Sequence, residues 1–499
     1  MGSIQAIFAT LGCLHMAGAE IQLYVRSQGL AHQTMAMNEL LAAVVEAGWP
    51  HTSVVSMKDA EEELRHGGLW SYFPWIWLSE KKRLKSKRSA RGGRWLVFLE
   101  ASTMVAPKVL GQLLSAYDAR EAWYLGRALK DEQMSIIHHY QQEPPYPLAH
   151  AGFALSGGLL RKLVLDLEEK PLGGGQQIEP VWELASRLSK MGIAITDHRG
   201  FCLEAATGCA TWARSLEPFR PSMGLTAAEL VIAVKTVEKF HSVRLPLLKE
   251  FWTDESAVEV LYLSNTKSHC VQEADLGCND LVDIIDLSLE FGDMVDPSKE
   301  SNKQGSGHCT KMQAILRYLH RSRPSRRWYV VTDDDTLVNV PRLLRVLDSH
   351  DDSLAIYLGE RYGWSHMQDR DGTNYITTGA GMALSNAALQ RLMSCSTCNC
   401  RAPDAPDDMS LGTWFRNLGI EATHEEGFHQ SEPQNYHKEL LGASDPPVSF
   451  HRFNARLPGS ASAEEFHEAR RQSWSSWRKN YFKQDWYFCT WLTGTPDCH

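Results

Sequence analysis

The sequence predicts an α/β protein with two tandem domains of one type, the first of which has lost its polar site. The main observation is a repeated pattern, since residues 94–103 (RWLVFLEAST) and 327–336 (RWYVVTDDDT) both read as an apolar strand with a polar end. Further pairs follow in the same order, 125–127 with 358–360 and 151–156 with 380–385. A length of 499 residues leaves room for two or three domains.

The repeat sets the expected domain boundaries. We expect a first domain over 20–212, a proline-bearing linker over 213–227 and a second domain over 228–455. The tail, 456–499, is rich in tryptophan and charge and is expected to wrap rather than form a third core. Residues 1–19 end in an A-x-A-like pattern without a basic segment before it, so a signal peptide and an ordinary N-terminal segment both remain open.

Composition narrows the class of protein. A hydrophobic content of 43% and a charged content of 22% are typical of a globular protein. The formal net charge of −9 argues against a nucleic-acid binder. The one basic run, 81–88, is interpreted as a solvated loop. No apolar stretch is long enough to predict a transmembrane span.

The cysteines favour an oxidising compartment. Cys395, Cys398 and Cys400 resemble half of a zinc site, but no second Cys/His pair follows at finger-like spacing. We therefore expect disulfides in a secretory lumen, with one cysteine left over because the total of 11 is odd.

The second domain alternates strands and helices. Strands are expected at 230–234 and 328–332, and helices at 246–252, 312–319 and from 341 to 347. Such alternation favours a mainly parallel sheet, in which ligands bind at the carboxyl ends of the strands.

Three carboxylates, Asp333, Asp334 and Asp335, fall at such a strand end. Adjacent acids repel one another unless a cation neutralises them, and oxygen ligands suit Mg²⁺ or Mn²⁺. Because alternate residues of an extended segment point the same way, Asp333 and Asp335 are expected to share an ion while Asp334 faces elsewhere. A solvated acidic turn is the alternative.

Other polar positions follow along the chain. Asp407 and Asp408 open a predicted helix, where one acid is expected to cap the helix and the other is a candidate general base. The small-residue segment 375–383 allows backbone to approach a ligand closely, although a packed turn is the favoured explanation of this segment taken by itself. His429 follows a short strand and is a candidate third metal ligand.

The order of these motifs resembles the β-1,3-glycosyltransferases related to Fringe. The second domain carries the motifs at 233–236 (AVKT), 307–311 (GHCTK), 328–336 (the strand ending in DDDT), 358–363 (LGERYG), 375–381 (YITTGAG), 405–412 (APDDMSLG) and 427–430 (GFHQ). In the first domain, 123–129 and 136–140 resemble a non-catalytic half found in a member of that family.

The resemblance implies two GT-A (Rossmann-like) domains, the first degenerate, and a metal-dependent hexosyltransferase. It implies that Mn²⁺ is held by Asp333, Asp335 and His429, and that Asp408 is the catalytic base. The residues implied in donor binding are Lys235, Asp334, Gly379, Gly381 and Asp407.

The reaction expected from the resemblance is inverting transfer of glucose from UDP-glucose to O-linked fucose on thrombospondin type 1 repeat proteins, in the endoplasmic reticulum lumen or secretory pathway. A different UDP-sugar donor and a non-catalytic glycan-binding or folding-assistance protein are the alternatives. The chain ends in PDCH (496–499) rather than the retention tetrapeptide common in the family, so retention stays open.

The first domain lacks the proposed chemistry. By the offsets of the repeat, Glu100, Ala101 and Ser102 correspond to the acid triplet, Cys202 to His429 and Val181 to Asp408. We predict that this half holds the acceptor protein or braces the catalytic half.

Overall fold

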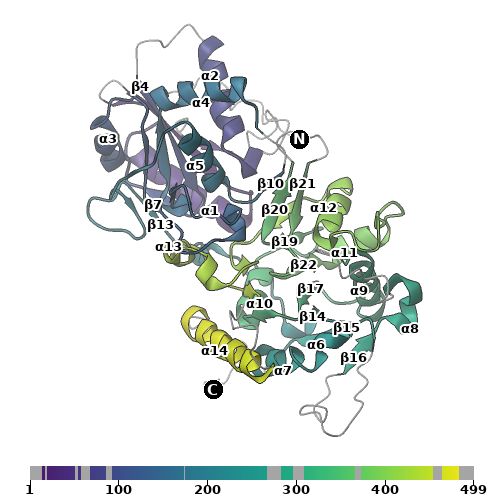
Figure 1. Ribbon diagram of the computed structural model, residues 1–499. Helices are drawn as coiled ribbons and strands as arrows, with labels where there is room; N and C mark the ends of the chain where they lie inside the picture. The colour runs from purple at the N-terminus through teal and green to yellow at the C-terminus, as the bar shows by residue number, and fades with distance from the viewer. Residues whose placement is uncertain are drawn as a thin grey trace. The chain divides into compact units, whose positions relative to one another are not determined.

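The computed structural model divides the chain into two compact units (Figure 1). The structure describes residues 14–16, 19–50, 54–57, 68–85, 93–172, 175–254, 256–266, 283–295, 308–365, 372–452 and 463–482. The first unit comprises Met1–Arg220, Trp364–Gly372 and Gln434–Asp445, and the second comprises the remaining segments. The division after Arg220 falls inside the expected linker.

The first unit contains a sheet flanked by helices. Its helices are α1 (Ala31–Glu46), α2 (Phe73–Lys85), α3 (Pro107–Ser115), α4 (Gly157–Glu169), α5 (Pro180–Lys190) and α13 (Lys438–Ala443). Its strands are β1 (Leu14–Met16), β2 (Ala19–Arg26), β3 (Val54–Ser56), β4 (Gly93–Glu100), β5 (Thr103–Val105), β6 (Tyr124–Gly126), β7 (Ala128–Leu129), β8 (Tyr146–Pro147), β9 (Phe153–Ser156), β10 (Gln176–Gln177), β11 (Thr196–Asp197), β12 (Phe201–Cys202) and β13 (Thr211–Ala213).

The second unit has the same mixture of elements. Its helices are α6 (Glu238–His241), α7 (Leu245–Leu248), the π-helical turn η8 (Lys249–Thr253), α8 (Ser288–Phe291), α9 (Cys309–Ser322), α10 (Val340–Asp348), α11 (Asn386–Met393), α12 (Asp407–Asn417) and α14 (Ala463–Tyr481). Its strands are β14 (Leu230–Lys235), β15 (Glu259–Ser264), β16 (Ile284–Asp286), β17 (Trp328–Asp333), β18 (Thr336–Val338), β19 (Tyr357–Gly359), β20 (Arg361–Trp364), β21 (Thr373–Ile376), β22 (Met382–Ser385), β23 (Ala422–His424), β24 (Phe428–His429) and β25 (Ser449–His451).

The main sheet of the second unit is mostly parallel. Its strand order is β16-β15-β14-β17-β22-β19-β23, and Figure 1 shows the middle strands side by side. Of these strands, β22 alone runs against its neighbours β17 and β19. Apolar side chains of α9, α11 and α12 form one core with the strands, including Ile315, Leu389 and Phe415. The sheet therefore has a buried interior and a polar edge where β14 and β17 end.

The main sheet of the first unit has the corresponding order, β3-β2-β4-β9-β6-β11, with β1 also paired to β2. Here β9 runs against β4 and β6, as β22 does in the second unit. The registers agree as well, since Trp95 pairs with Ser156 and Trp328 with Ser385. In each unit a small three-stranded sheet lies beside the main one, with the orders β12-β13-β5 and β18-β25-β24.

Most of the elements expected in the second unit are present. Strands β14 and β17 and helices α9 and α10 cover the predicted ranges, whereas the predicted helix at 246–252 is split between α7 and η8. The prediction of a loop for the basic run is wrong for residues 81–85, which lie in α2. Residues 86–88, 1–13 and the chain beyond 482 lie outside the described residues. No described helix combines the length and apolar character needed to cross a membrane.

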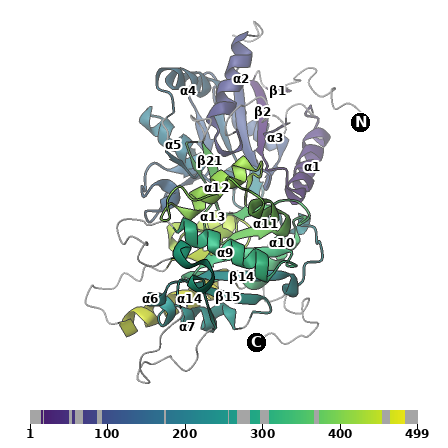
Figure 2. The ribbon, with the colours of Figure 1, turned by 90° about the vertical axis from the view of Figure 1, so that its right-hand side faces the viewer.

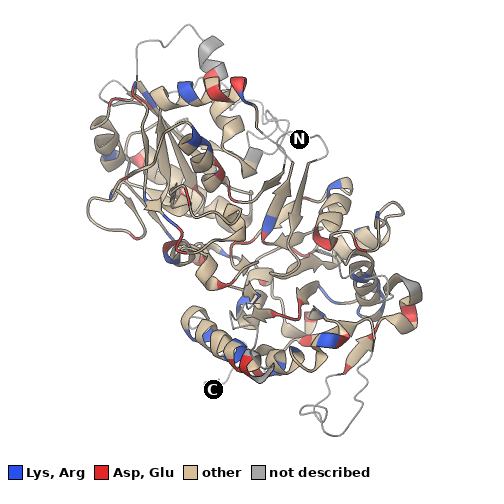
Figure 3. Ribbon diagram, viewed as in Figure 1, with Lys and Arg blue, Asp and Glu red and all other residues tan. Residues whose placement is uncertain are grey.

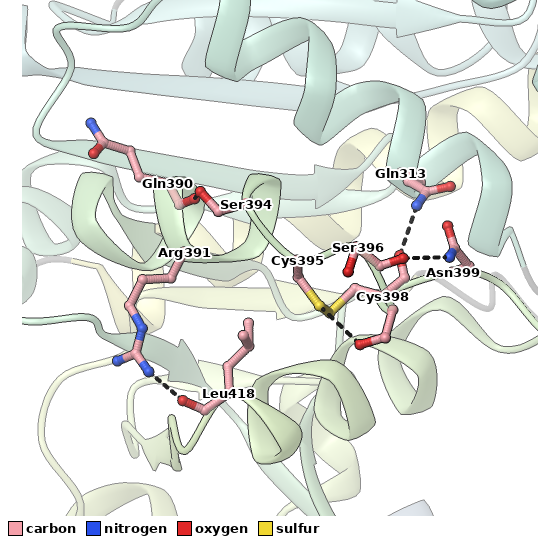
Figure 4. The surroundings of a disulfide bond; sticks show 10 residues. Gln313, Gln390, Arg391, Ser394, Cys395, Ser396, Cys398, Asn399 and Leu418 are labelled. Atoms are coloured by element: carbon pink, nitrogen blue, oxygen red, sulfur yellow. Dashed lines mark hydrogen bonds between the residues drawn. A yellow bond between two sulfur atoms is a disulfide. The ribbon is translucent and has the colours of Figure 1, made fainter.

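The cysteines considered as half of a zinc site form disulfides instead. Cys395 bonds to Cys398, Cys309 to Cys400, and Cys202 to Cys209. Figure 4 shows the first of these with Gln313 of α9, whose side-chain amide donates to the Cys398 carbonyl at 2.9 Å. The loop between α11 and α12 is thereby fixed to α9, and this loop leads directly into the acids at the start of α12.

Candidate active site

The acid triplet lies at the carboxyl end of β17, where it joins a histidine. Asp333, Asp335 and His451 each offer a ligand atom, and these atoms lie within 4.8 Å of one another. The Nε2 atom of His451 is 3.1 Å from Asp335 Oδ1 and 3.6 Å from Asp333 Oδ2. Two carboxylates and an imidazole form a donor set that fits a divalent cation such as Mn²⁺.

His451 is oriented by the backbone behind it. Its Nδ1 lies 3.1 Å from the carbonyl oxygen of Gln430, so Nδ1–H donates there and Nε2 faces the carboxylates. Burial opposes protonation of this ring, but Asp335 and Asp333 outweigh burial and raise the pKa of His451. The position therefore attracts a positive charge.

The expected third ligand, His429, is not part of this group. His429 lies opposite Phe450 in the pairing of β24 with β25, and the two rings stack with centroids 4.8 Å apart. Successive residues of a strand point to opposite faces, so Phe450 and His451 diverge. His429 therefore shares the face of Phe450, while His451, opposite Thr336, faces the acids. Burial lowers the pKa of His429 to about 3, as in an apolar core.

Lys235 connects the triplet to the start of α12. It ends β14 directly opposite Asp333, and its ammonium group is 3.0 Å from Asp333 Oδ1 and 2.7 Å from Asp407 Oδ2. Burial would favour the neutral amine, but the two carboxylates outweigh it and raise the pKa of Lys235. The lysine stays charged and holds the end of β14 to the start of α12, where its partner Asp407 lies 172 residues further along the chain.

Asp334 and Asp335 form the turn between β17 and β18, and the Asp334 carboxylate lies outside the group of Asp333, Asp335 and His451. Its carboxylate accepts a hydrogen bond from Thr236 Oγ1 at 2.6 Å and forms an ion pair with Arg244. Arg244 also lies 3.1 Å from Asp335, and its guanidinium stacks 3.6 Å from the Phe240 ring centroid. These contacts leave Asp334 buried, and burial raises its pKa although Arg244 opposes the shift.

The two acids of α12 have different environments. Burial would raise the pKa of Asp407, but Lys235 outweighs it and lowers that pKa, so Asp407 stays ionised. Burial and the adjacent negative charge of Asp407 raise the pKa of Asp408 to about 7. Asp408 accepts a hydrogen bond from the Met409 backbone at 2.7 Å and is only partly buried by area. Asp407 thus serves an ion pair, and Asp408 has the proton affinity of a general base working near neutral pH.

Close packing fixes α12 in place. A side chain at Gly412 would lie 2.5 Å from Tyr375 Cβ, so glycine allows the helix to rest directly on β21. On its other side the Cys309 backbone donates to Ala405 at 3.2 Å, next to the Cys309–Cys400 disulfide. The position of Asp408 is therefore set from two sides.

The glycines expected to approach a donor also shape the histidine site. A Cβ on Gly379 would lie 2.5 Å from His451 Cε1 and 2.8 Å from Gln430 Nε2, so the absence of a side chain makes room for His451. Gly381 has a φ of +98°, a conformation that favours glycine. This segment is a packed turn beside the acid cluster, and its contact with a donor stays a prediction.

The site residues that sequence reasoning missed are His451, Arg244 and Thr236. His451 follows the short alternating run Val448-Ser449-Phe450, which resembles the run before His429, so two histidines offered the same signal. Arg244 lies in the turn between α6 and α7, far from the triplet in sequence, so only the fold brings it to the acids.

The first unit has the same framework with other residues. Arg26 ends β2 opposite Glu100 of β4, as Lys235 lies opposite Asp333, and the Nε–H group of Arg26 donates to both carboxylate oxygens of Glu100 at 2.9 Å. Tyr72 donates to Glu100 at 3.3 Å. Ala213 of β13 lies opposite Thr103, the place that His451 occupies opposite Thr336. In the first unit, paired side chains therefore occupy the sheet edge that corresponds to the acid cluster of the second unit.

Comparisons with known proteins agree on one family. The sequence model described as Fringe-like matches residues 76–194 and 225–470. A human protein named beta-1,3-glucosyltransferase is 35% identical over 374 residues, covering 73% of this chain and 69% of the relative. Its mouse counterpart is 36% identical over 396 residues, covering 77% and 73%. The Fringe glycosyltransferase of Drosophila melanogaster is 26% identical over 176 residues, covering 33% and 39%.

Solved structures give weaker likenesses. A galactosyltransferase crystallised with donor and acceptor sugar analogues covers 50% of this chain and 99% of its own, with 14% identity and a TM-score of 0.29. We draw no argument from a score of this size.

Proposed function

Because this chain belongs to the Fringe-like family of glycosyltransferases, we propose that it is an inverting β-1,3-glucosyltransferase acting through the second unit. The donor would be UDP-glucose and the acceptor O-linked fucose on thrombospondin type 1 repeat proteins. The observation that carries the site assignment is the meeting of Asp333, Asp335 and His451 at the strand edge next to Asp408.

The residues would divide the work. The divalent metal would be held by Asp333, Asp335 and His451, and we propose that it is Mn²⁺. When bound, the metal supplies positive charge that stabilises a departing diphosphate. Asp408 would accept the proton of the acceptor hydroxyl as that oxygen attacks the sugar C1 from the face opposite UDP. Lys235 and Asp407 would keep the base and metal sites in register, and Gly379, Gly381 and Asp334 would border the donor.

We also propose that the two units are tandem GT-A domains and that the first has lost its chemistry. The matching strand orders and registers support a duplication. In the first unit the positions of the ligands are taken by Glu100, Ser102 and Ala213, and α5 begins with Pro180 and Val181 where α12 begins with Asp407 and Asp408. This unit would hold the acceptor protein or brace the catalytic unit. The disulfides support a place in the secretory pathway.

A panel of UDP-sugars tests the proposed function. With Mn²⁺ and a fucosylated repeat domain, we expect UDP release from UDP-glucose that stops on chelation and is absent with the unfucosylated repeat. Faster UDP release from UDP-galactose or UDP-N-acetylglucosamine would mean that this sugar nucleotide, and not UDP-glucose, is the donor. No release with any donor, despite folded protein, would favour a glycan-binding or folding-assistance role.

Replacing Glu100 with alanine tests the loss of chemistry in the first unit. The change removes the Glu100 partner of the partly buried Arg26, so we expect a loss of stability in that unit below the roughly 3–5 kcal/mol of a fully buried pair. Thermal unfolding would show this loss, while titration calorimetry should give unchanged affinity for UDP with Mn²⁺. A marked fall in nucleotide affinity would contradict the assignment, and Asp333→Ala provides the matched comparison in the second unit.

A further inference from the structure

Two disulfides of different kinds meet in the loop that follows α11. Cys395–Cys398 joins cysteines three residues apart, whereas Cys309–Cys400 joins cysteines 91 residues apart. Figures 1 and 2 show α9 and α11 on the same side of the main sheet, and both helices contribute to one core. The first disulfide is therefore a local C-x-x-C link, and the second ties the loop to the start of α9.

The loop has anchors that do not depend on the C-x-x-C link. Gln313 of α9 donates its side-chain amide to the Cys398 carbonyl at 2.9 Å, as Figure 4 shows. The Cys309–Cys400 disulfide holds the same loop covalently. When Cys395–Cys398 opens, both of its sulfurs therefore stay on a fixed framework from which the bond can form again.

Access to the C-x-x-C pair is one-sided. Cys395 is partly exposed between the exposed residues Ser394 and Ser396, whereas Cys398 is only 5% exposed and belongs to the core. Exchange begins when a thiolate attacks one sulfur of a disulfide, and its rate depends on access to that sulfur. An incoming thiolate therefore meets Cys395 first, and Cys398 is the sulfur that leaves.

A small pocket lies beside this disulfide. Its volume is about 40 Å³, and both cysteines line it together with Leu316, Leu392, Met393 and Trp414. A single water needs only roughly 10–15 Å³, so a small apolar group fits. Arg317 of α9 also lines the pocket, and the basic residues of this helix, which carries no acid, are blue in Figure 3. The pocket thus offers an apolar contact and a positive charge to a thiolate that approaches Cys395.

We propose that Cys395–Cys398 is a thiol–disulfide exchange site that oxidises pairs of cysteines in polypeptides. The C-x-x-C spacing suits this reaction, because the second thiol stays within reach of the first after the bond breaks. An apolar side chain next to the reacting cysteine would enter the pocket. A polypeptide can supply such a side chain and glutathione cannot. This activity is separate from sugar transfer and does not depend on the proposed function.

The exchange transfers two electrons. A substrate thiolate attacks Cys395 Sγ, the bond to Cys398 breaks, and its electron pair leaves on Cys398 Sγ, which takes a proton from solvent. The second substrate thiolate then attacks the first substrate sulfur and displaces Cys395, which is protonated in turn. The substrate gains a disulfide and the protein holds two thiols. A low-molecular-weight disulfide such as oxidised glutathione restores the protein disulfide by the same two steps.

Titration of the full chain with glutathione buffers tests whether the pair is redox-active. After alkylation and mass spectrometry, we expect Cys395–Cys398 to be half reduced in a buffer about 100-fold less reducing than the one that opens Cys309–Cys400. Cys202–Cys209 is the matched control, because it also joins a partly exposed cysteine to a buried one but lacks the C-x-x-C spacing. It should open with Cys309–Cys400, and thermal unfolding in the same buffers should show that the chain stays folded when only Cys395–Cys398 is reduced.

Trapping of mixed disulfides tests the direction of attack and the partner. Cys398→Ser and Cys395→Ser each leave one thiol of the pair, so their difference reports the position of that thiol. With a disulfide-bonded peptide that has leucine beside each cysteine, Cys398→Ser should form a mixed disulfide at least about tenfold faster than Cys395→Ser. The same peptide with glycine in place of leucine, and oxidised glutathione, should react more slowly with Cys398→Ser. The oxidised unaltered chain should convert the reduced leucine peptide to its disulfide, and Cys395→Ser should not.

Opening of all three disulfides in the same buffer, or equal trapping by the two serine variants, would overturn the exchange site. Equal rates with oxidised glutathione and with the leucine peptide would overturn the polypeptide partner. None of these measurements uses a sugar donor, so their failure is distinct from failure of the proposed glycosyl transfer.

Discussion

Replacing Asp408 with asparagine is expected to lower kcat by about 10²- to 10⁴-fold, the contribution typical of a general base. The amide cannot accept the acceptor's proton, yet it keeps the size of the side chain and its hydrogen bond from Met409. Affinity for UDP with Mn²⁺ should stay nearly unchanged, because Lys235 pairs with Asp407 rather than with Asp408. Rates with saturating donor and acceptor, together with calorimetry of UDP, check both parts.

The pH profile gives an independent check of the same assignment. Asp408 must be ionised to act as a base, and its pKa is raised to about 7 by burial and by Asp407, with Asp333 adding to the shift and Lys235 opposing it. The rate should therefore rise with pH, by about tenfold per unit below 7, and level off above it. The residual activity of Asp408→Asn should lack this rise. A rate that is flat between pH 5 and 8 in the unaltered chain would exclude this base.

Asp407→Asn, the same change one residue earlier, is the matched control for Asp408→Asn. Asp407→Asn removes one of the two carboxylates that neutralise the buried Lys235 and is expected to destabilise the second unit, because the lysine keeps only Asp333 as a charged partner. Its defect should therefore appear in thermal unfolding and nucleotide binding together. If Asp407→Asn lost only kcat while Asp408→Asn lost only stability, the two roles would be exchanged.

The second large effect is expected from the metal ligands. Asp335→Asn and His451→Gln should each weaken Mn²⁺ binding by more than about 100-fold, since even outer-shell partners of a metal typically contribute 10- to 100-fold. His429→Gln should leave Mn²⁺ affinity unchanged, because His429 lies on the other face of its strand against Phe450. Manganese titration followed by electron paramagnetic resonance measures the affinity directly. A strong loss of Mn²⁺ affinity in His429→Gln, with none in His451→Gln, would mean that His429 is the metal ligand, as expected from the sequence.

The acid triplet shows how far local sequence can go. The apolar run before Asp333 predicts a strand, and alternation of side chains predicts that Asp333 and Asp335 lie together while Asp334 turns away. In the structure the strand ends at Asp333 and the next two acids form a turn, in which Asp335 lies with Asp333 and His451 while Asp334 contacts Thr236 and Arg244. The strand is thus a local feature of the sequence, whereas the turn after Asp333, and not strand alternation, brings Asp335 beside Asp333.

The histidine shows where local reasoning ends. His429 and His451 both end short strands, and either could serve as a ligand on sequence alone. The difference comes from the pairing of β25 with both β18 and β24, which places His451 opposite Thr336 and Phe450 opposite His429. A shift of one residue in that register would reverse the two faces.

The sequence by itself determined the α/β class, the acid-rich strand end and the paired acids at the start of α12, because each depends on residues that are contiguous in the chain. Only the tertiary structure decided which histidine joins the acids, that Lys235 lies between Asp333 and Asp407, and that Arg244 contacts the triplet. Those choices depend on strand register and on helix packing between segments far apart in the chain. The physical reason is that a charged side chain acquires its role from the charges and burial around it, and these exist only after folding.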